Sequence, residues 1–568
     1  MIQTQEPKRS RRLWKGVLAL LLLLQINLPL SYAAPSPADT EEQNRRSRQQ
    51  AQEQQQRRQQ KDIFLQQGTK GSEDTSLPEE SPSFVVNTLQ LTGDGADCFP
   101  WAQTMLNRYK GRKIGIQGIN LIVKRLTNAF IDRGYITTRI VVPEQNLSGG
   151  TLKLILIPGR VGHIRFADPN VWGNWQNAFP AHPGDILNLR NLEQGLEQMK
   201  RVPSQDVTMQ LVPGKQPGES DVVINVKRGK PYRFVFSIDD SGQTETGKIQ
   251  MSETLAMDNL LGLNDLFNFT KSGDGDRDGD LHGTRGDSVY YSFPYQNSTF
   301  SFTSSRYHYH QTVATAQPTH LSGENDSMEF HLTQLLDRDQ VSKTNLELAI
   351  SKGHIRSFVE DVELENQRYD TTAFKIGLSH RHYFGQTTLD FELDNKRGVP
   401  WFGAQSDPET PGLQTTRYNM WLLDVNLTTP VHFGSAQGRY SLSFHGQYTR
   451  DLLWGTDYIS IGNRYTVRGF DGEETLSADS GWYLRNELSI PVNSSGLEAY
   501  AGLDYGEVYG NGALDQNLLG RILTGAVLGV RGGTQNSHYD LFVGWPLRQP
   551  DGFVAANPTY GFQFVYQI

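Results

Sequence analysis

The chain has 568 residues, and its 54 Lys and Arg against 62 Asp and Glu give a formal net charge of −8, which argues against nucleic acid as the main partner. Charged residues make up 20% of the chain and the mean hydropathy is −0.52, which excludes a helical membrane transporter. The single cysteine, Cys98, excludes an intrachain disulfide framework and a four-cysteine zinc site. The 55 glycines and 10% aromatic residues in so polar a chain are typical of many strands and turns.

Residues 1–33 are predicted to form a Sec-type signal peptide. A basic stretch at 8–15 precedes an apolar core at 17–30, and small residues follow at 31–33 where a signal peptidase reads them. The alternative is a membrane anchor, which the short apolar core disfavours. We therefore expect an exported protein.

Residues 39–63 favour a helix that is polar on every side. The segment is rich in Gln, Glu and Arg and lacks Pro and Gly. Such a helix is either a solvated leader or lies in a wet environment, and at 1.5 Å per residue it would reach about 36 Å, enough to thread a bilayer-spanning pore. We predict a plug helix at 39–63, followed by a flexible linker at 64–82.

Residues 83–158 and 159–229 read as two copies of one small α/β module. The first copy is predicted to have strands at 84–91, 138–142 and 151–157 and helices at 101–109 and 117–133. The second copy has predicted strands at 161–166, 206–211 and 221–226 and a helix at 188–199. We expect the order β-α-α-β-β over about 70 residues in each copy, with free sheet edges.

Residues 230–568 contain about sixteen segments in which apolar residues alternate with polar ones. Apolar-out, polar-in alternation with aromatic ends is typical of a transmembrane β-barrel. The connections also alternate, long near 272–286, 311–325, 354–370, 395–416, 451–479 and 546–558, and short between them. Short turns on one side and long loops on the other favour a sixteen-stranded barrel over the alternatives, a soluble β-sandwich or a propeller.

The longest of these loops, 451–479, contains Val467, Arg468, Gly469 and Phe470. Two strands later the parity of the apolar residues directs Asp504 into the lumen, two residues before Gly506. A loop that folds inward would bring Arg468 to Asp504, where a guanidinium makes planar paired contacts with a carboxylate. The alternative is an exposed arginine in a glycine turn.

Together, these features resemble the TpsB transporters of two-partner secretion, the filamentous-haemagglutinin and haemolysin transporter type. The resemblance covers essentially the whole mature chain. In that family a V-R-G-[FY] motif lies in the loop between barrel strands eleven and twelve, and an aromatic-x-D-x-G motif lies on strand thirteen. Residues 467–470 and 502–506 are similar to these motifs, with Gly502 in place of the aromatic residue. Residues 258–264 and 539–546 also look family-like.

The resemblance implies an outer-membrane transporter with its two POTRA modules in the periplasm, which exports a large unfolded exoprotein such as a haemolysin, adhesin or contact-dependent toxin. The POTRA edges would capture the exoprotein by strand addition, the barrel-assembly machinery would insert the barrel, and the protein would act as a monomer. The plug helix would have to leave, and Arg468 would hold the conduit's conformation. The alternatives are a barrel-assembly insertase, which usually carries more POTRA modules, and a passive porin, which has no use for them.

We expect no enzyme activity, cofactor or metal. No nucleotide-binding, nucleophile-elbow or zinc motif is present in the sequence. Residues 274–280 resemble the start of an EF-hand loop, but Arg285 stands at position twelve where a bidentate Glu is needed. The paired histidines at 308/310 and 380/382 are explained by a polar lumen or rim.

Overall fold

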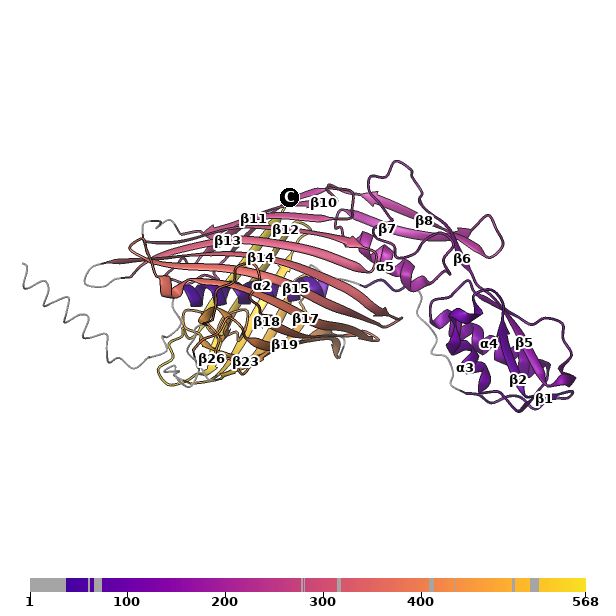
Figure 1. Ribbon diagram of the computed structural model, residues 1–568. Coiled ribbons are helices and arrows are strands. Elements are labelled where there is room, and N and C mark those ends of the chain that lie inside the picture. Colours follow the sequence, from indigo (N-terminus) through magenta and orange to yellow (C-terminus); the bar gives the residue numbers. More distant parts are fainter. Residues whose placement is uncertain are drawn as a thin grey trace, which may run out of the picture.

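The computed structural model describes residues 37–59, 62–65, 74–276, 279, 281–313, 318–407, 413–434, 436–492, 496–510 and 520–568. The predicted signal peptide lies outside the described residues. Figure 1 shows two small α/β units at one end of the molecule, a large barrel, and a helix inside the barrel. None of the described helices is both long and apolar enough to cross a membrane.

The helix inside the barrel is α2 (Pro37–Gln59) (Figure 1). It begins two residues before the predicted start and ends four residues before the predicted end. Residues 62–64 are not helical, because the main chain of Ile63 is hydrogen-bonded to side chains of other elements. The predicted helix end at 63 is therefore wrong.

The first α/β unit contains a three-stranded sheet in the order β2-β5-β4, with β2 parallel to β5, and a separate β1–β3 pair. A single apolar core, which includes Phe99, Leu126 and Phe130, lies between the sheet and the helices. The predicted first strand is two strands, since the chain breaks at Asn87. Its elements are β1 (Phe84–Val86), β2 (Thr88–Thr92), η1 (Ala96–Cys98), α3 (Pro100–Asn107), β3 (Arg112–Ile114), α4 (Ile116–Asp132), β4 (Arg139–Val141), η2 (Leu147–Gly149) and β5 (Thr151–Ile157).

The second α/β unit has one helix instead of the predicted two. Its sheet has the order β6-β8-β7, and its elements are β6 (Arg160–Phe166), α5 (Leu189–Lys200), β7 (Gln205–Pro213) and β8 (Glu219–Arg228). The stretch 167–188, where a first helix was expected, contains Pro169, Pro180 and Pro183 and forms turns and extended chain. Proline removes a main-chain donor and interrupts a helix, so this copy keeps only α5.

The barrel is closed by sixteen antiparallel strands, as predicted, with β27 pairing to β9. Its strands are β9 (Tyr232–Asp239), β10 (Gln250–Asp258), β11 (Leu266–Asp274), β12 (His282–Tyr295), β13 (Ser298–Val313), β14 (Thr319–Arg338), β15 (Ser342–Val359), β17 (Tyr369–Phe384), β18 (Thr387–Gly398), β19 (Asn419–Phe433), β20 (Ala436–Thr449), β23 (Ser480–Pro491), β24 (Glu498–Tyr509), β25 (Ile522–Gly533), β26 (Ser537–Arg548) and β27 (Thr559–Gln567).

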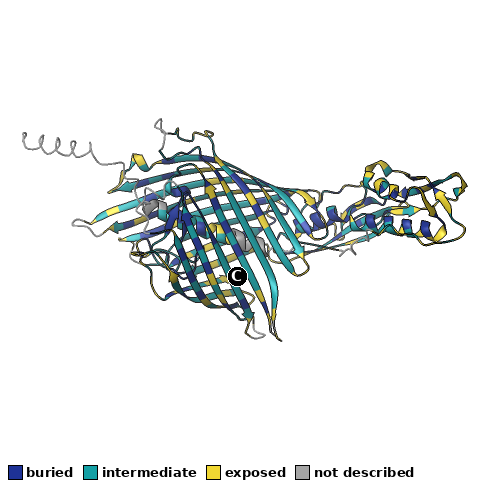
Figure 2. Ribbon diagram, turned by 90° about the horizontal axis from the view of Figure 1, so that it is seen from below, coloured by how far each residue is buried: buried dark blue, intermediate teal, exposed yellow. Residues whose placement is uncertain are grey.

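Exposure varies from residue to residue along these strands (Figure 2), and many large apolar side chains of the strands are exposed. Examples are Phe234 and Phe236 on β9 and Ile376 and Leu378 on β17, each at least 39% exposed. Two predicted long loops, at 311–325 and 354–370, are partly strand, because β13, β14 and β15 continue their pairing far beyond the 9–11 residues that cross a bilayer. A two-residue β16 (Val362–Glu363) and η3 (Glu365–Gln367) extend this hairpin region.

Candidate functional site

The long loop between β20 and β23 folds into the barrel and has a small apolar core of its own. It contains η4 (Gly455–Asp457), β21 (Ile459–Ile461) and β22 (Leu476–Ala478), and β21 pairs with β22. Side chains of this hairpin pack on the inner wall in one cluster, whose members include Ile461, Val467, Phe470, Val508, Leu523 and Phe553. The loop connects the eleventh and twelfth strands of the barrel, which is where the motif was expected.

Arg468 lies at the inner wall and is bonded to Asp504 through three N–H groups. Its Nε and Nη2 donate to the two carboxylate oxygens of Asp504 at 2.7 and 3.0 Å, and its main-chain N–H donates to Oδ2 at 3.0 Å. Nη2 also donates to the main-chain oxygen of Asn486 at 3.1 Å. Asp504 is fully buried. This bidentate geometry is the strong form of an ion pair and fixes both direction and distance.

A second carboxylate, Glu487 on β23, completes the contacts of Arg468. Its Oε2 accepts from Arg468 Nη1 at 2.5 Å, and its Oε1 lies 2.8 Å from Arg531 on β25. Arg531 in turn bonds Glu498, which also pairs with Arg439. The charges therefore continue from the loop motif down the inner wall toward the short turns. Sequence reasoning missed Glu487, although it shares the inward parity of β23 that could have identified it.

Glycines on the inner wall let the loop lie directly against β24, β25 and β26. A Cβ atom at Gly506 would lie 2.7 Å from Val467, and one at Gly525 would lie 1.9 Å from the main-chain oxygen of Arg468. Gly469, the loop glycine, has φ +101°, a conformation that favours glycine, and a Cβ atom at Gly544 would lie 2.7 Å from its main chain. The family-like stretch at 539–546 thus lies under the loop tip.

The other two motif residues are apolar anchors. Val467 is fully buried against Gly506, and Ile461 belongs to the same cluster. Phe470 is 2% exposed and meets the ring of Phe553 edge-on at 5.7 Å. The structure therefore brings all of the predicted motif residues together at one patch of the inner wall.

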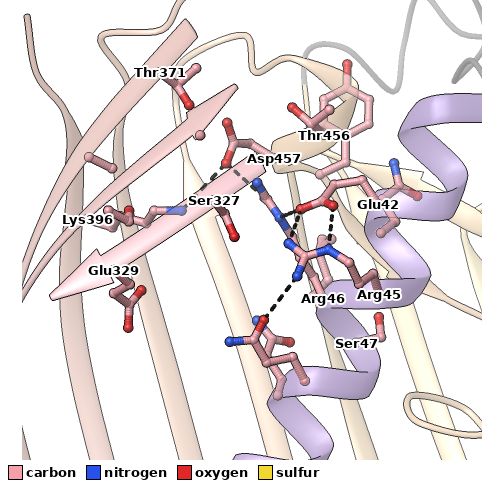
Figure 3. Close-up of a pocket in the computed structure, with 18 of the residues that line it drawn as sticks. Glu42, Arg45, Arg46, Ser47, Ser327, Glu329, Thr371, Lys396, Thr456 and Asp457 are labelled. Carbon is pink, nitrogen blue, oxygen red and sulfur yellow. Dashed lines mark hydrogen bonds and ion pairs between the residues drawn. The ribbon is translucent and has the colours of Figure 1, made fainter. Parts of the chain in front are cut away.

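Helix α2 contacts the inward loop through charged side chains, as Figure 3 shows. Asp457 lies between Arg46 of the helix, 3.0 Å away, and Lys396 of β18, 3.6 Å away. Glu42 is buried and pairs with Arg45 and Arg46 at 2.8 Å each. A polar cavity of about 270 Å³ lies beside this cluster, between α2 and the barrel wall.

Further polar contacts hold α2 to both the loop and the wall. Gln43 donates to the main-chain oxygen of Gly455 at 2.7 Å, and Asn463 donates to Asn44 at 3.2 Å. Glu41 accepts from Tyr307 of β13 and from Thr246 of the β9–β10 connection. The described side chains of α2, those of residues 40–52, therefore hold the helix in the lumen through polar contacts that water can replace.

The second α/β unit is joined to the barrel through the turns on its side. The family-like stretch at 258–264 forms the β10–β11 turn, where Asp258 accepts from the Ser204 N–H at 2.9 Å. Arg201 donates to both oxygens of Ser292. Burial opposes ionisation of Glu197 on α5, but the nearby cations of Lys343 and Arg338 outweigh it and lower its pKa to about 2. The junction is thus built from hydrogen bonds and buried ion pairs.

Where the structure describes them, the sequence features considered as metal sites do not form a cluster of ligands. Among the residues that the structure describes, no group of three or more His, Cys, Asp or Glu side chains is placed to hold a metal ion. His380 stacks on His382 at 5.8 Å and contacts Thr344, and His308 lies near Glu324. Part of the 274–280 loop lies outside the described residues.

Comparison with known proteins decides the family. The model for the haemolysin secretion/activation proteins ShlB/FhaC/HecB matches residues 218–532, a ShlB-type POTRA domain matches 84–159, and a second POTRA domain matches 160–213. The chain belongs to the ShlB/FhaC/HecB family. This ShlB-type chain is therefore a TpsB transporter with two POTRA domains, POTRA1 and POTRA2, ahead of its barrel.

Individual relatives agree with this assignment. The chain is 43% identical to the outer membrane transporter CdiB-2 of Burkholderia pseudomallei over 87% of this chain and 88% of that one. It is 31% identical to the hemolysin transporter protein HpmB of Proteus mirabilis over 69% and 70% of the two chains. The solved structure of CdiB from Escherichia coli superposes with a TM-score of 0.84 and 27% identity, covering 95% of this chain and all of that one.

The family membership gives the protein's place and role. It is an outer-membrane transporter of two-partner secretion that exports an exoprotein, and its POTRA domains lie in the periplasm. The short barrel turns adjoin POTRA2, so the long loops face the cell exterior. The members of the family are transporters.

Proposed function

We propose that this transporter is closed at rest by α2 together with the loop between β20 and β23, and that export begins when α2 leaves the lumen. The observation that carries the proposal is the position of α2 inside the barrel, bonded to Asp457, Gly455 and Asn463 of the inward loop. All of these contacts are polar. They keep the helix in place in the absence of an exoprotein and are lost without exposing an apolar surface.

In this proposal Arg468 and Asp504 keep the loop on the inner wall while the helix leaves. Their three hydrogen bonds and the apolar anchors Val467 and Phe470 fix the loop independently of α2. Gly506 provides the space into which Val467 packs. The conduit would then lie between the loop and the opposite wall, where α2 now lies.

The exoprotein would be captured by the POTRA domains in extended form. In POTRA1 the strands β2 and β4 are the outer members of the sheet. Val141 on β4 and Ile157 at the end of the neighbouring β5 are exposed beside the β4 edge. Main-chain pairing along such an edge tolerates many sequences. Transport would need no chemical step at this chain, since folding of the exoprotein outside can draw it through. The barrel-assembly machinery would insert the barrel, and the transporter would act as a monomer.

The proposal is tested by co-expressing the transporter with its partner exoprotein and measuring delivery of the exoprotein to the medium. Arg468→Ala should abolish delivery while leaving a heat-modifiable barrel in the outer membrane. The matched control is Arg306→Ala, which removes an exposed Arg–Asp pair with Asp326 far from the loop motif and should leave delivery unchanged. Normal delivery by Arg468→Ala would show that the motif does not have this role.

A further inference from the structure

The segment Asp62, Ile63, Phe64 and Leu65 is neither helical nor part of a sheet, and it lies between POTRA2 and the periplasmic mouth of the barrel. The Ile63 N–H donates to Glu197 at 3.3 Å and the Leu65 N–H donates to Glu193 at 2.7 Å. The Ile63 carbonyl accepts from Arg338 Nη2 at 2.6 Å. In an extended chain the N–H and C=O of one residue and the N–H of the second residue after it lie on the same edge. Three side chains therefore make the hydrogen bonds to this edge that the main chain of a neighbouring strand would make.

These three side chains are held in place without help from the segment. Arg338 pairs with Glu197 at 2.8 Å and bonds Gln194 at 3.0 Å, and Glu193 pairs with Arg190 at 2.6 Å. Glu193 is fully buried and the side chain of Arg338 is 3% exposed. We call the site formed by Glu193, Glu197, Arg338 and Tyr383 the mouth cleft. It joins α5 of POTRA2 to β14 and β17 of the barrel.

Successive side chains of the segment point to opposite partners, as in a strand. Ile63 packs against the apolar core of POTRA2. Phe64 meets the ring of Tyr383 edge-on at 5.2 Å, with the guanidinium of Arg338 5.6 Å from its centre. Asp62 accepts from the Tyr383 hydroxyl at 2.8 Å. The mouth cleft thus hydrogen-bonds one edge of the main chain, and the side chains of successive residues pack on separate surfaces.

The position of the cleft gives it a role in export. Helix α2 ends at Gln59, shortly before the segment, so withdrawal of the helix moves the segment as well. A chain that travels from POTRA2 into the lumen passes between α5 and the ends of β14 and β17, which carry Arg338 and Tyr383. Carboxylates that accept main-chain N–H groups bind any residue type except proline, which suits a cargo of unrelated sequence.

We propose that the mouth cleft is a binding site for an extended polypeptide main chain, occupied at rest by residues 62–65 and during export by the exoprotein. The second half of this inference rests on the proposed function, and the first half does not. The segment is therefore an internal competitor of the cargo. The cleft transfers the cargo from POTRA2 to the lumen by the same three hydrogen bonds.

The first half is tested by peptide binding to the full chain in lipid nanodiscs. The variant Asp62→Ala/Phe64→Ala weakens the internal occupant without altering the cleft. The probe is a fluorescent, acetylated and amidated peptide with the sequence of residues 61–67. N-methylation at the positions of Ile63 and Leu65 removes both N–H donors and should weaken binding at least tenfold, since each bond is made to a charged acceptor. The matched control is N-methylation at positions 62 and 64, on the opposite edge, which should change affinity less than threefold. Equal affinity of all three peptides, or no binding at all, would overturn the site.

The second half is tested in cells with the photo-reactive residue p-benzoylphenylalanine in place of Tyr383. The control position is Tyr295, an exposed tyrosine at another short turn. An exoprotein arrested by a folded fusion domain should cross-link from position 383 and not from 295. Without exoprotein, position 383 should cross-link to residues 62–65. Efficient secretion without a cross-link from 383 would overturn the transfer role, whereas absence of secretion would overturn the proposed function and leave the peptide result standing.

Discussion

A single methyl group at Gly502 should release the loop motif from the barrel wall. A Cβ atom at this position would lie 2.5 Å from Arg468 Nη2, 2.8 Å from Val527 and 2.9 Å from the main-chain oxygen of Asn486. Ordinary contacts begin near 3.4 Å, so the guanidinium is about 0.9 Å too close. Strand β24 is paired on both sides and cannot retreat, and therefore Arg468 has to move.

The expected size follows from the two hydrogen bonds that Nη2 makes. Both, at 3.0 and 3.1 Å, lengthen beyond hydrogen-bonding distance when the guanidinium shifts by about 1 Å. Bonds to charged groups are each worth about 1.5–3 kcal/mol, and the Nε bond to Asp504 remains. We expect Gly502→Ala to weaken the closed loop by about 3–6 kcal/mol, which lowers its equilibrium constant by about 150-fold to 25,000-fold.

The assay is amide hydrogen exchange of the loop in nanodiscs, read by mass spectrometry on peptides that cover β21 and β22. Their exchange should accelerate by that factor in Gly502→Ala. The control is Gly353→Ala on β15, where an added Cβ meets only the Thr371 hydroxyl at 3.1 Å. Arg468→Lys, which lacks the forked guanidinium, is combined with Gly502→Ala in a double-mutant cycle. The effects of the two substitutions on the exchange rate should not be additive. Unchanged exchange in Gly502→Ala, or strict additivity with Arg468→Lys, would refute the reasoning.

Three further outcomes are expected. The depressed pKa of Glu197 means that its contribution to the POTRA2–barrel junction is complete above about pH 4.5 and is lost as the pH falls through about 2. The protection factors of the α5 amides against hydrogen exchange should therefore fall as the pH is lowered across that window. Glu197→Gln should remove this pH dependence. Asp457→Asn removes the charge that pairs with Arg46 and should raise the ion conductance of the barrel in planar bilayers toward that of a variant without residues 37–59, and unchanged conductance would argue against a plug. Glu80 accepts hydrogen bonds from three main-chain N–H groups at the start of α4, and these bonds lower its pKa although desolvation opposes this. Glu80→Gln should therefore lower the melting temperature of POTRA1. An unchanged melting temperature would mean that the cap does not stabilise the domain.

The sequence alone was sufficient for the barrel and for the position of its motif loop. Alternation of apolar and polar residues is a local pattern, because successive side chains of a strand point to opposite faces. The same parity directed Asp504 inward, and the strand count put Arg468 in the loop before the twelfth strand. Besides the helix end at 63, two predictions failed because a local pattern competed with another effect. Prolines removed one helix of POTRA2, and pairing between β13, β14 and β15 extended into residues that had been expected to be loops.

What only the tertiary structure decided are contacts between residues far apart in the chain. Glu487 completes the contacts of Arg468, Gly502 and Gly525 make room for the loop, and the mouth cleft binds residues 62–65 with side chains more than 120 residues away. No local pattern distinguishes these residues from other charged or glycine residues of an inward face. Their partners are set by the closure of the barrel and by the docking of POTRA2 on its turns, and so the fold had to be known before the site was complete.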